Sequence, residues 1–355
     1  MSGFDLTMRP LALLVIFMSC APTWCCGSGT SEIDNLIVFG DSYSDEGRLE
    51  YFLAHNNTPP PAGTYIPEAN LTSSGGRSWP QFAAKKLGAT TYNYAVSGAV
   101  CTDIFPGVLP SVKEYEALAF LADVAYVNPA TGTNTLYTNR TSDNTVYSLW
   151  IGTNDLGVDA FLTDSQPAGK TLNDFIDCVW PTFDSIYSAG GRKFIIFNES
   201  PLNYTPLYRS LENGGAGDVP RWPDKESYNT TEYEQKVEEY VTLTNTVFDY
   251  GVPFQLLVKK RWPDASFGVF DVHQLISDIY NSPSDYLDAP ANATGYYAQC
   301  PSTLSLGTAD CNVSSHPLSS FLWYDELHMS PKVHEYIATE FVNVVNKSSN
   351  YGIYY

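Results

Sequence analysis

Short apolar runs alternate along the chain with longer stretches in which apolar and polar residues recur at a helical period. The short runs are rich in β-branched and aromatic residues and predict buried strands, whereas the longer stretches predict amphipathic helices. The expected strands are 36–39, 145–151, 193–197 and 267–272, and the expected helices are 79–87, 112–124, 172–188 and 232–248. Pro181 falls inside the third helix and predicts either a kink or a misplaced helix. The alternation favours an α/β fold with a parallel sheet.

The last helix has the clearest start. Ser330 is a suitable N-cap and Pro331 suits the first helical position. The apolar residues that follow fall on one face, namely Val333, Ile337, Phe341 and Val344. Because this helix begins two residues after His328, we expect that histidine on the loop leading into a helix that packs on the sheet.

Two long polar stretches, 56–78 and 203–229, contain many Pro, Gly, Asn and Tyr residues. Loops of this length in a globular domain are often functional, so they are expected to surround a site. The alternative is that they are glycosylated surface with no role in binding.

The composition favours one acidic domain. With 355 residues, of which 44% are hydrophobic, the chain can bury one large core, and residues 28–355 are expected to form a single domain. The formal net charge of -20 disfavours nucleic acid and anionic membranes as partners. Charged residues make up only 16% and aromatic residues 14%, which suits neutral substrates such as sugars or esters. A monomer is expected.

The N-terminus has the pattern of a secretory signal. An apolar run, 11–17, follows Arg9, and Cys25 and Gly27 are small residues at suitable cleavage positions, so residues 1–27 are expected to be removed. Met8 precedes the charged residue and is a second possible start. The run is shorter than the roughly 20 apolar residues that a membrane span requires. The sequence therefore predicts a secreted, extracellular protein.

Four cysteines remain after such a cleavage, and secreted thiols in even number usually pair. Cys300 and Cys311 flank a short polar loop containing Gly307, which favours their pairing and leaves Cys101 with Cys178. Because the sequence has no Cys-x-x-Cys or Cys/His cluster, neither a metal site nor a cofactor is expected.

N-glycosylation sequons are dense in this sequence. A proline directly after the triplet weakens three of them, at Pro59, Pro201 and Pro206. The candidate acceptors are Asn56, Asn70, Asn139, Asn198, Asn203, Asn229, Asn292, Asn312 and Asn346.

The residues of a serine hydrolase are present at the two ends of the domain. Ser42 follows the first predicted strand, and the C-terminal part supplies Asp325 and His328. A serine hydroxyl needs an imidazole to take its proton, and the imidazole needs a carboxylate to fix its tautomer. The segment around Ser42 lacks the second glycine of a Gly-x-Ser-x-Gly elbow, which disfavours the α/β-hydrolase fold.

Two further segments are suited to stabilise an oxyanion. Gly98 follows the apolar run 93–96, and Asn154 follows the strand that ends at Ile151. Both are expected at the carboxyl ends of strands, where open parallel sheets bind ligands. Backbone or amide donors at this edge would face the reacting carbonyl.

These four segments resemble the blocks of the GDSL, or SGNH, hydrolase family, which contribute one Ser, Gly, Asn and His in this order. The resemblance extends from the first strand to the last helix, and it departs from the family pattern at Tyr43, where the family has Leu. It implies a three-layer, flavodoxin-like α/β/α sandwich with a mostly parallel sheet. It also implies that Ser42 is the nucleophile, that Asp325 orients the base His328, and that the Ser42 and Gly98 amides and the Asn154 side chain form the oxyanion hole.

Other polar residues are expected to be structural. Asp41 and Asp155 are interpreted as turn-forming residues, and His273 as a core residue inside a strand. His334 is expected to pack or face solvent. His55 and His316 lie in polar loops.

Within the family, the segments around Ser42 and Asn154 are most similar to fungal acetylesterases of carbohydrate esterase family sixteen. That resemblance implies removal of acetyl groups from hemicellulose-derived oligosaccharides. Four aromatic residues are candidates for stacking on sugar rings, although packing is their commoner role: Tyr43, Trp79, Trp222 and Trp323. Two alternatives are a lipase or phospholipase that acts on longer acyl esters and a secreted glycan-binding protein without activity.

Overall fold

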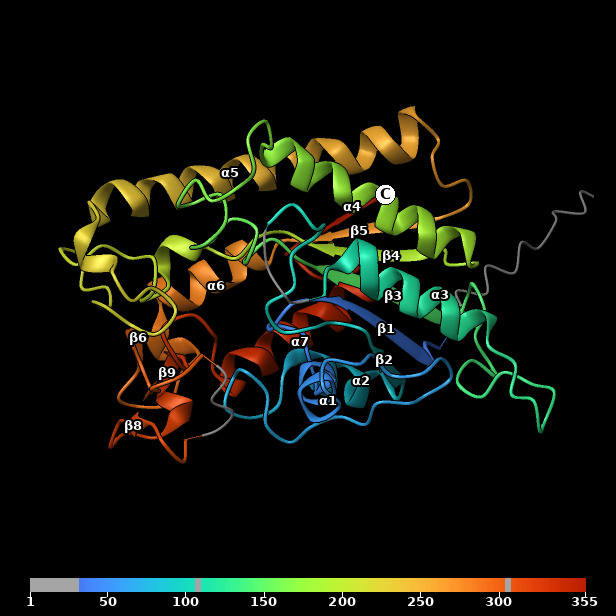
Figure 1. Ribbon diagram of the computed structural model, residues 1–355, viewed down its shortest axis with the longest axis horizontal. Coiled ribbons are helices and arrows are strands. Elements are labelled where there is room, and N and C mark those ends of the chain that lie inside the picture. The colour runs from blue at the N-terminus through green and yellow to red at the C-terminus, as the bar shows by residue number, and fades with distance from the viewer. Residues whose placement is uncertain (1–31, 106–109, 304–307) are drawn as a thin grey trace, which may run out of the picture. The chain divides into compact units, whose positions relative to one another are not determined.

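The computed structural model describes residues 32–105, 110–303 and 308–355 (Figure 1). The expected signal segment, with Cys20, Cys25 and Cys26, and Gly307 lie outside the described residues. Contacts group Ser31–Tyr355 into one unit. Within the described residues, none of the helices has the length and apolarity needed to cross a membrane.

A six-stranded sheet forms the centre of the fold, with strand order β10-β5-β4-β3-β1-β2. All neighbouring strands are parallel except β10, which pairs antiparallel with β5 at one edge. The mostly parallel sheet expected from the alternating pattern is therefore confirmed. The strands are β1 (Asn35–Gly40), β2 (Thr90–Asn93), β3 (Thr145–Trp150), β4 (Lys193–Phe197), β5 (Ser266–Phe270) and β10 (Gly352–Tyr354).

Helices cover both faces of the sheet. Alternate residues of β1 point to opposite sides: Ile37 and Phe39 join one core, and Leu36 and Val38 join the other. The first core is closed by α3 (Ala117–Ala125), α4 (Leu172–Ser188) and α5 (Thr230–Pro253). The second is closed by α2 (Trp79–Leu87), α6 (Val272–Asn281) and α7 (Pro331–Val345). Figure 1 shows α3, α4 and α5 on one side of the sheet and α2 and α7 on the other. The three-layer sandwich is confirmed.

The predicted helices are all present, with changes at their ends. Helix α4 continues through Pro181, so the helix was placed correctly. The segment 112–124 divides into a π-helical turn (Val112–Glu116) and α3. Helix α5 is longer than expected and leads into a second π-helical turn (Phe254–Val258).

Two helices were missed in the sequence analysis. Helix α1 (Arg48–Ala54) begins soon after Ser42, and α6 occupies the segment where the strand 267–272 was expected to end. The interpretation of His273 as a strand residue is wrong. Strand β5 ends at Phe270 because the Asp271 side chain accepts a hydrogen bond from the Gln274 amide (3.0 Å) and caps α6, which places His273 in the first helical turn.

Smaller elements complete the fold. Two short two-stranded sheets pair β6 (Asn292–Tyr296) with β9 (Phe321–Trp323) and β7 (Ala298–Gln299) with β8 (Asn312–Val313). Short 3₁₀ turns occur in the long loops and near the C-terminal part, at Leu202–Tyr204, Lys225–Ser227, Pro283–Asp285 and Leu318–Ser320.

The disulfides join Cys101 to Cys178 and Cys300 to Cys311, which is the pairing that the sequence favoured. Two glycosylation candidates need correction. Asn198 and Asn203 are buried, and the Asn198 side chain bonds Asp271 and the His273 amide. A glycan requires an exposed amide nitrogen, so both are poor acceptors in the folded protein.

Candidate active site

The point where the strand order reverses lies between β1 and β3. From β1 the chain proceeds to β2 on one side, and it then returns to form β3 on the other. In open parallel sheets the crevice at such a point, beyond the carboxyl ends of the strands, is where ligands bind. Ser42 follows β1 and Asn154 follows β3, so both side chains lie at this crevice.

A tight turn presents Ser42 to the cleft. Gly40 ends β1 with φ 145°, and a Cβ atom there would lie 2.2 Å from the Trp150 carbonyl oxygen, so only glycine fits. After it, the Asp41 carboxylate accepts a hydrogen bond from the Tyr43 amide (3.0 Å), and the Asp41 carbonyl accepts one from the Ser44 amide (2.9 Å). The interpretation of Asp41 as a turn-forming residue is confirmed by these contacts.

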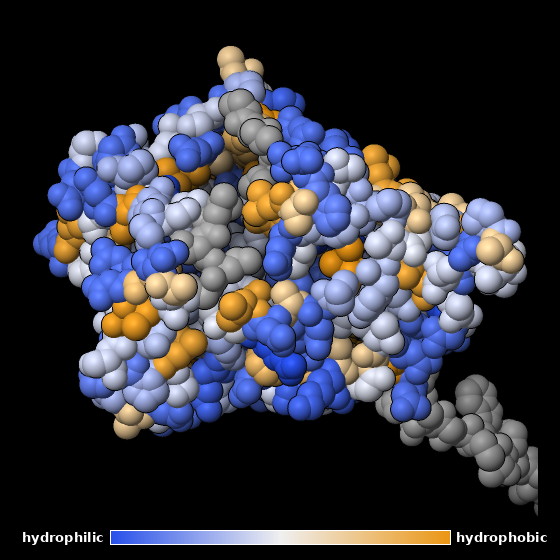
Figure 2. Space-filling view, turned by 60° about the horizontal axis from the view of Figure 1, so that its bottom comes forward, coloured by the Kyte–Doolittle hydropathy of each residue, from blue (hydrophilic) through white to orange (hydrophobic). Residues whose placement is uncertain are grey.

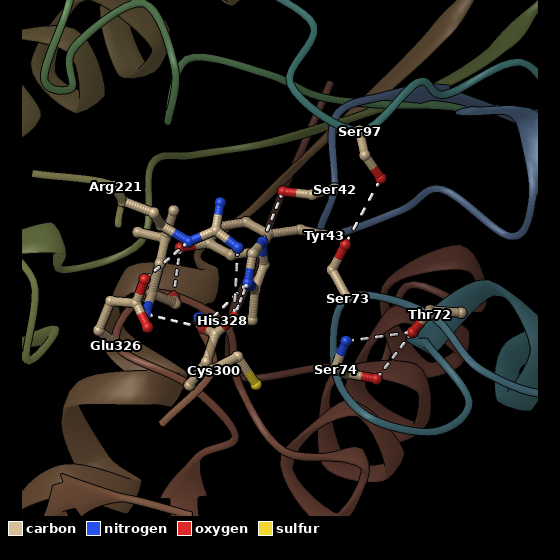
Figure 3. A network of polar contacts seen from close by, with 12 residues as sticks. Ser42, Tyr43, Thr72, Ser73, Ser74, Ser97, Arg221, Cys300, Glu326 and His328 are labelled. Carbon is tan, nitrogen blue, oxygen red and sulfur yellow. Dashed lines mark hydrogen bonds and ion pairs between the residues drawn. The ribbon is translucent and has the colours of Figure 1, made fainter. Parts of the chain in front are cut away.

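The histidine and the aspartate lie on the loop between β9 and α7. The Asp325 carboxylate accepts hydrogen bonds from the amides of Leu327 (2.9 Å) and His328 (2.7 Å), which fixes the loop around the carboxylate. The same carboxylate lies 2.8 Å from Nδ1 of His328, and Nε2 of His328 lies 2.8 Å from Oγ of Ser42 (Figure 3). A carboxylate only accepts, so Nδ1 carries the proton and Nε2 is left to accept from the serine hydroxyl.

The electrostatics of this group are set by burial and by one arginine. Burial opposes ionisation of Asp325, but the charges of His328 and Arg221 outweigh it and hold the pKa of that carboxyl below its usual range. Arg221 comes from the loop 203–229, with Nη2 3.3 Å from Asp325 and Nε 3.0 Å from Glu326. Burial also lowers the pKa of His328, against the opposing charge of Asp325.

Three residues that carry candidate oxyanion donors, namely Ser42, Gly98 and Asn154, line the cleft. The Asn154 side chain donates one hydrogen bond to the Ala99 carbonyl (2.9 Å), which leaves its second amide hydrogen free to donate elsewhere. Gly98 adopts φ 84°, which glycine tolerates best. Within the described part of the chain, the backbone amides of Ser42 and Gly98 have no hydrogen-bond acceptor. These three residues and His328 line the same cleft.

Asp45 joins the nucleophile turn to the Gly98 loop. Its carboxylate accepts hydrogen bonds from three amides at the start of α1, at distances of 2.7 to 3.2 Å. It also accepts from the amide (2.8 Å) and the hydroxyl (2.9 Å) of Ser97, the residue before Gly98. No sequence signal indicates this role, because Ser97 is brought to Asp45 only by the fold.

Buried carboxyl groups bind backbone amides in the two segments that carry Ser42 and Gly98. The Asp155 carboxylate accepts a hydrogen bond from the Cys101 amide (3.0 Å), which lies 54 residues away in the chain, and Glu116 accepts one from the Gly40 amide (2.9 Å). Burial raises the pKa of Asp41 to about 7 and that of Asp155 to about 8, and it raises the pKa of Glu116 well above its usual range. The buried surroundings therefore disfavour the charged form of all three acids.

The four aromatic residues considered for stacking on sugar have the commoner role, which is packing. The four aromatic side chains proposed for stacking, Tyr43, Trp79, Trp222 and Trp323, are all buried, with exposures of 0 to 1%. Tyr43 instead donates to the Leu327 carbonyl (3.1 Å) and packs its ring edgewise on His328. It supports the loop that carries the imidazole. The apolar part of the described cleft lining consists of leucines: Leu49, Leu53 and Leu71.

The remaining histidines are not part of the cleft lining that the structure describes. His334 is buried and accepts a hydrogen bond from the Trp79 amide (3.2 Å), and burial lowers its pKa to about 3. His55 ends helix α1, and His316 is exposed in a loop.

Comparisons with known proteins assign the chain to a family. The model of the GDSL-like lipase/acylhydrolase family matches residues 36–341, and the chain belongs to this family. It is a carboxylic ester hydrolase. An acetylesterase of Hypocrea jecorina is 48% identical over 328 residues, covering 90% of this chain and 91% of that protein. The family resemblance inferred from the four segments is thus confirmed.

More distant similar proteins are also esterases. An acetylesterase of Thermothelomyces thermophilus is 28% identical over 71% of this chain and 82% of that protein. Among solved structures, an acetylxylan esterase from Geobacillus stearothermophilus is 13% identical, with a TM-score of 0.37, over 89% of this chain and 96% of that chain. That score is too low to bear on the function.

Proposed function

We propose that this protein is a secreted acetylesterase that removes acetyl groups from hemicellulose-derived oligosaccharides through a covalent acyl-enzyme. The observation that carries the proposal is the continuous contact from Asp325 through His328 to Ser42, with both heavy-atom distances at 2.8 Å. The similarity to the Hypocrea acetylesterase supports the acetyl group as the acyl part.

In the first half of the reaction, His328 takes the proton of Ser42 while Oγ attacks the ester carbonyl carbon. Asp325 stabilises the imidazolium that forms. The negative oxygen of the tetrahedral intermediate accepts hydrogen bonds from the Ser42 and Gly98 amides and from the Asn154 side chain. His328 then gives its proton to the departing sugar oxygen, and the acetyl group stays on Ser42.

In the second half, water replaces the sugar. His328 takes a proton from the water, which attacks the acetyl carbonyl, and the same three donors stabilise the second oxyanion. Collapse of this intermediate returns the proton to Ser42 and releases acetate. The cycle needs no group beyond these side chains and amides.

The two alternatives receive less support. A glycan-binding protein has no need of a serine hydroxyl aligned with a buried imidazole and carboxylate. A lipolytic enzyme would dock on lipid, but on the face shown in Figure 2 hydrophobic residues lie in small separate patches between hydrophilic ones. The net charge of -20 further opposes binding to anionic lipid.

Product analysis on acetylated xylo-oligosaccharides tests the proposal. We expect release of acetate with the sugar backbone intact, as measured by mass spectrometry and proton NMR of the products. A parallel assay compares 4-nitrophenyl acetate with the octanoate ester. Release of no acetate from the oligosaccharide, together with a preference for the octanoate, would favour the lipolytic alternative.

Asn154→Ala is expected to lower kcat roughly 100- to 1,000-fold, with a much smaller change in KM. The reason is that the amide donates most strongly once charge has developed on the carbonyl oxygen. Steady-state kinetics with 4-nitrophenyl acetate measure the two constants. Asn134→Ala serves as a control, because Asn134 also donates to backbone carbonyls but lies outside the described cleft lining. A rise in KM with kcat unchanged would assign Asn154 to ground-state binding.

Asp45→Asn is expected to lower kcat about 10- to 100-fold, since an amide nitrogen would replace one of the charged acceptors that hold Ser97. Asp45 is a positioning residue, so kcat should fall more than KM rises. Ser97→Ala removes only the hydroxyl contact and should have a smaller effect. A lowered melting temperature with unchanged kcat would mean that Asp45 stabilises the fold without placing Gly98.

The pH dependence follows from the environment of His328. Only the neutral imidazole can act as base, and burial keeps the pKa of His328 below its ordinary value. We therefore expect kcat/KM to stay constant through neutral pH and to fall only below the usual histidine value of about 6.5. In Arg221→Gln the lost positive charge should raise the pKa and move this fall to higher pH. A fall above the usual value in the unmodified enzyme would contradict the account.

A further inference from the structure

One wall of the cleft is apolar and is built from three leucines. Leu49 and Leu53 lie four residues apart on α1, so they share one face of the helix and are separated by about 6 Å along it. Leu71 comes from the loop 56–78 and lines the same cleft. Leu53 is 51% exposed and Leu71 is 46% exposed, so these side chains are not needed to fill the core.

The wall is attached to the Gly98 side of the cleft. The Asp45 carboxylate binds both the first amides of α1 and Ser97, and the hydroxyls of Ser73 and Ser97 lie 3.5 Å apart. In Figure 3, Ser73 and Ser97 lie on one side of Ser42, and His328 and Arg221 lie on the other. Leu49 donates its amide to Asp45 and Leu71 lies two residues before Ser73, so we assign the leucine wall to the side of Ser73 and Ser97.

The chemistry of the ester defines the two sides of the cleft. The departing alcohol oxygen must lie near Nε2 of His328 to receive its proton, so the alcohol part occupies the side of His328 and Arg221. The oxyanion points to the amides of Ser42 and Gly98. The remaining substituent of the carbonyl carbon is the acyl group, which is directed to the side with Ser73, Ser97 and the leucines.

We propose that Leu49, Leu53 and Leu71 form an acyl subsite that binds the alkyl chain of short-chain esters longer than acetate, up to about hexanoate. The inference rests on the proposed esterase function and extends it from acetyl to short neutral acyl groups. Leu53 lies one helical turn beyond Leu49, so an acyl chain that contacts both leucines must be longer than acetyl. Glu50 lines the same cleft and adds a negative charge, which favours neutral esters and release of the carboxylate product.

The test is a ratio of rates. Values of kcat/KM for 4-nitrophenyl acetate, butyrate and hexanoate are measured for the wild type and for Leu53→Ser/Leu71→Ser. Each methylene in contact with the leucines contributes a factor of up to about 4. We expect the hexanoate-to-acetate ratio to fall at least about tenfold in the double variant. Because both side chains are exposed, circular dichroism should show an unchanged fold.

Two further variants sharpen the test. Leu243→Ser changes a leucine of similar exposure (46%) on α5, outside the described cleft lining, and should keep the wild-type ratio. Leu53→Phe fills the subsite and should lower the hexanoate rate more than the acetate rate. An unchanged ratio in the double variant, or an equal loss for all three esters, would overturn the subsite.

The outcomes also separate this inference from the proposed function. Suppose that the hexanoate-to-acetate ratio falls in the double variant but the wild type does not deacetylate oligosaccharides. The subsite is then supported and the substrate assignment fails. If the wild type deacetylates oligosaccharides and the ratio is unchanged, the subsite alone is wrong. If the loss of kcat/KM in the double variant depended on the alcohol part of the ester and not on the acyl chain, the leucines would contact the alcohol part. That result would also overturn the proposal.

Discussion

Replacing Ser42 with alanine is expected to lower kcat for acetyl esters by at least about 10⁴-fold, because a methyl group cannot form the acyl-enzyme. The variant should fold normally, since the hydroxyl contributes a single contact, to His328. The rate of 4-nitrophenyl acetate hydrolysis measures the loss, and thermal unfolding monitors the fold. Activity that remains should come only from the oxyanion donors and substrate binding.

Ser73→Ala is the matched control for this experiment. Ser73 also lines the cleft and exposes a hydroxyl there, but its nearest polar contact is Ser97 at 3.5 Å, not an imidazole. Its kcat should stay within a few-fold of the wild type. If Ser42→Ala kept a comparable share of the activity, another residue would have to be the nucleophile.

The second large effect is expected for His328→Ala, which should lower kcat by a similar factor of at least about 10⁴. Without the imidazole, the hydroxyl of Ser42 keeps its proton at neutral pH and the departing alcohol receives none. Since the serine and the histidine act as one unit, the double variant Ser42→Ala/His328→Ala should be no slower than either single variant.

Kinetics of both single variants and the double variant form a cycle that measures this coupling. The buried His334→Gln is a useful comparison, because His334 contacts the Trp79 amide and not Ser42. It should lower the melting temperature and leave kcat nearly unchanged. If the increases in activation free energy of the two single variants were additive in the double variant, Ser42 and His328 would act in separate steps.

Much of the fold could be predicted because the core elements have strong local patterns. Strands β1, β3 and β4 are short runs rich in apolar, β-branched and aromatic residues, and the helices on both faces have clear apolar faces. Helix α1 was missed because it has only 7 residues and its start depends on Asp45, whose partners include Ser97, distant in sequence. Strand β10 is short and pairs antiparallel with β5 at the edge, so its position depends on tertiary contacts alone.

The central residues of the site could also be predicted, since Ser42, Gly98, Asn154 and His328 follow strands or precede a helix in recognisable segments. The supporting residues could not. Arg221 reaches Asp325 from a loop more than 100 residues away, with no local signal. Which aromatic residues pack and which are exposed could not be predicted either, because Trp79 and Trp323 are buried by helices and loops whose packing the sequence does not reveal.

Trapping the covalent intermediate tests the central claim most directly. The enzyme is mixed with an excess of 4-nitrophenyl acetate, quenched in acid after a few milliseconds, and digested for mass spectrometry. The account predicts one added acetyl group on the peptide that contains Ser42, and no such adduct in Ser42→Ala. An acetyl group on a different residue, with Ser42 unmodified throughout turnover, would contradict it.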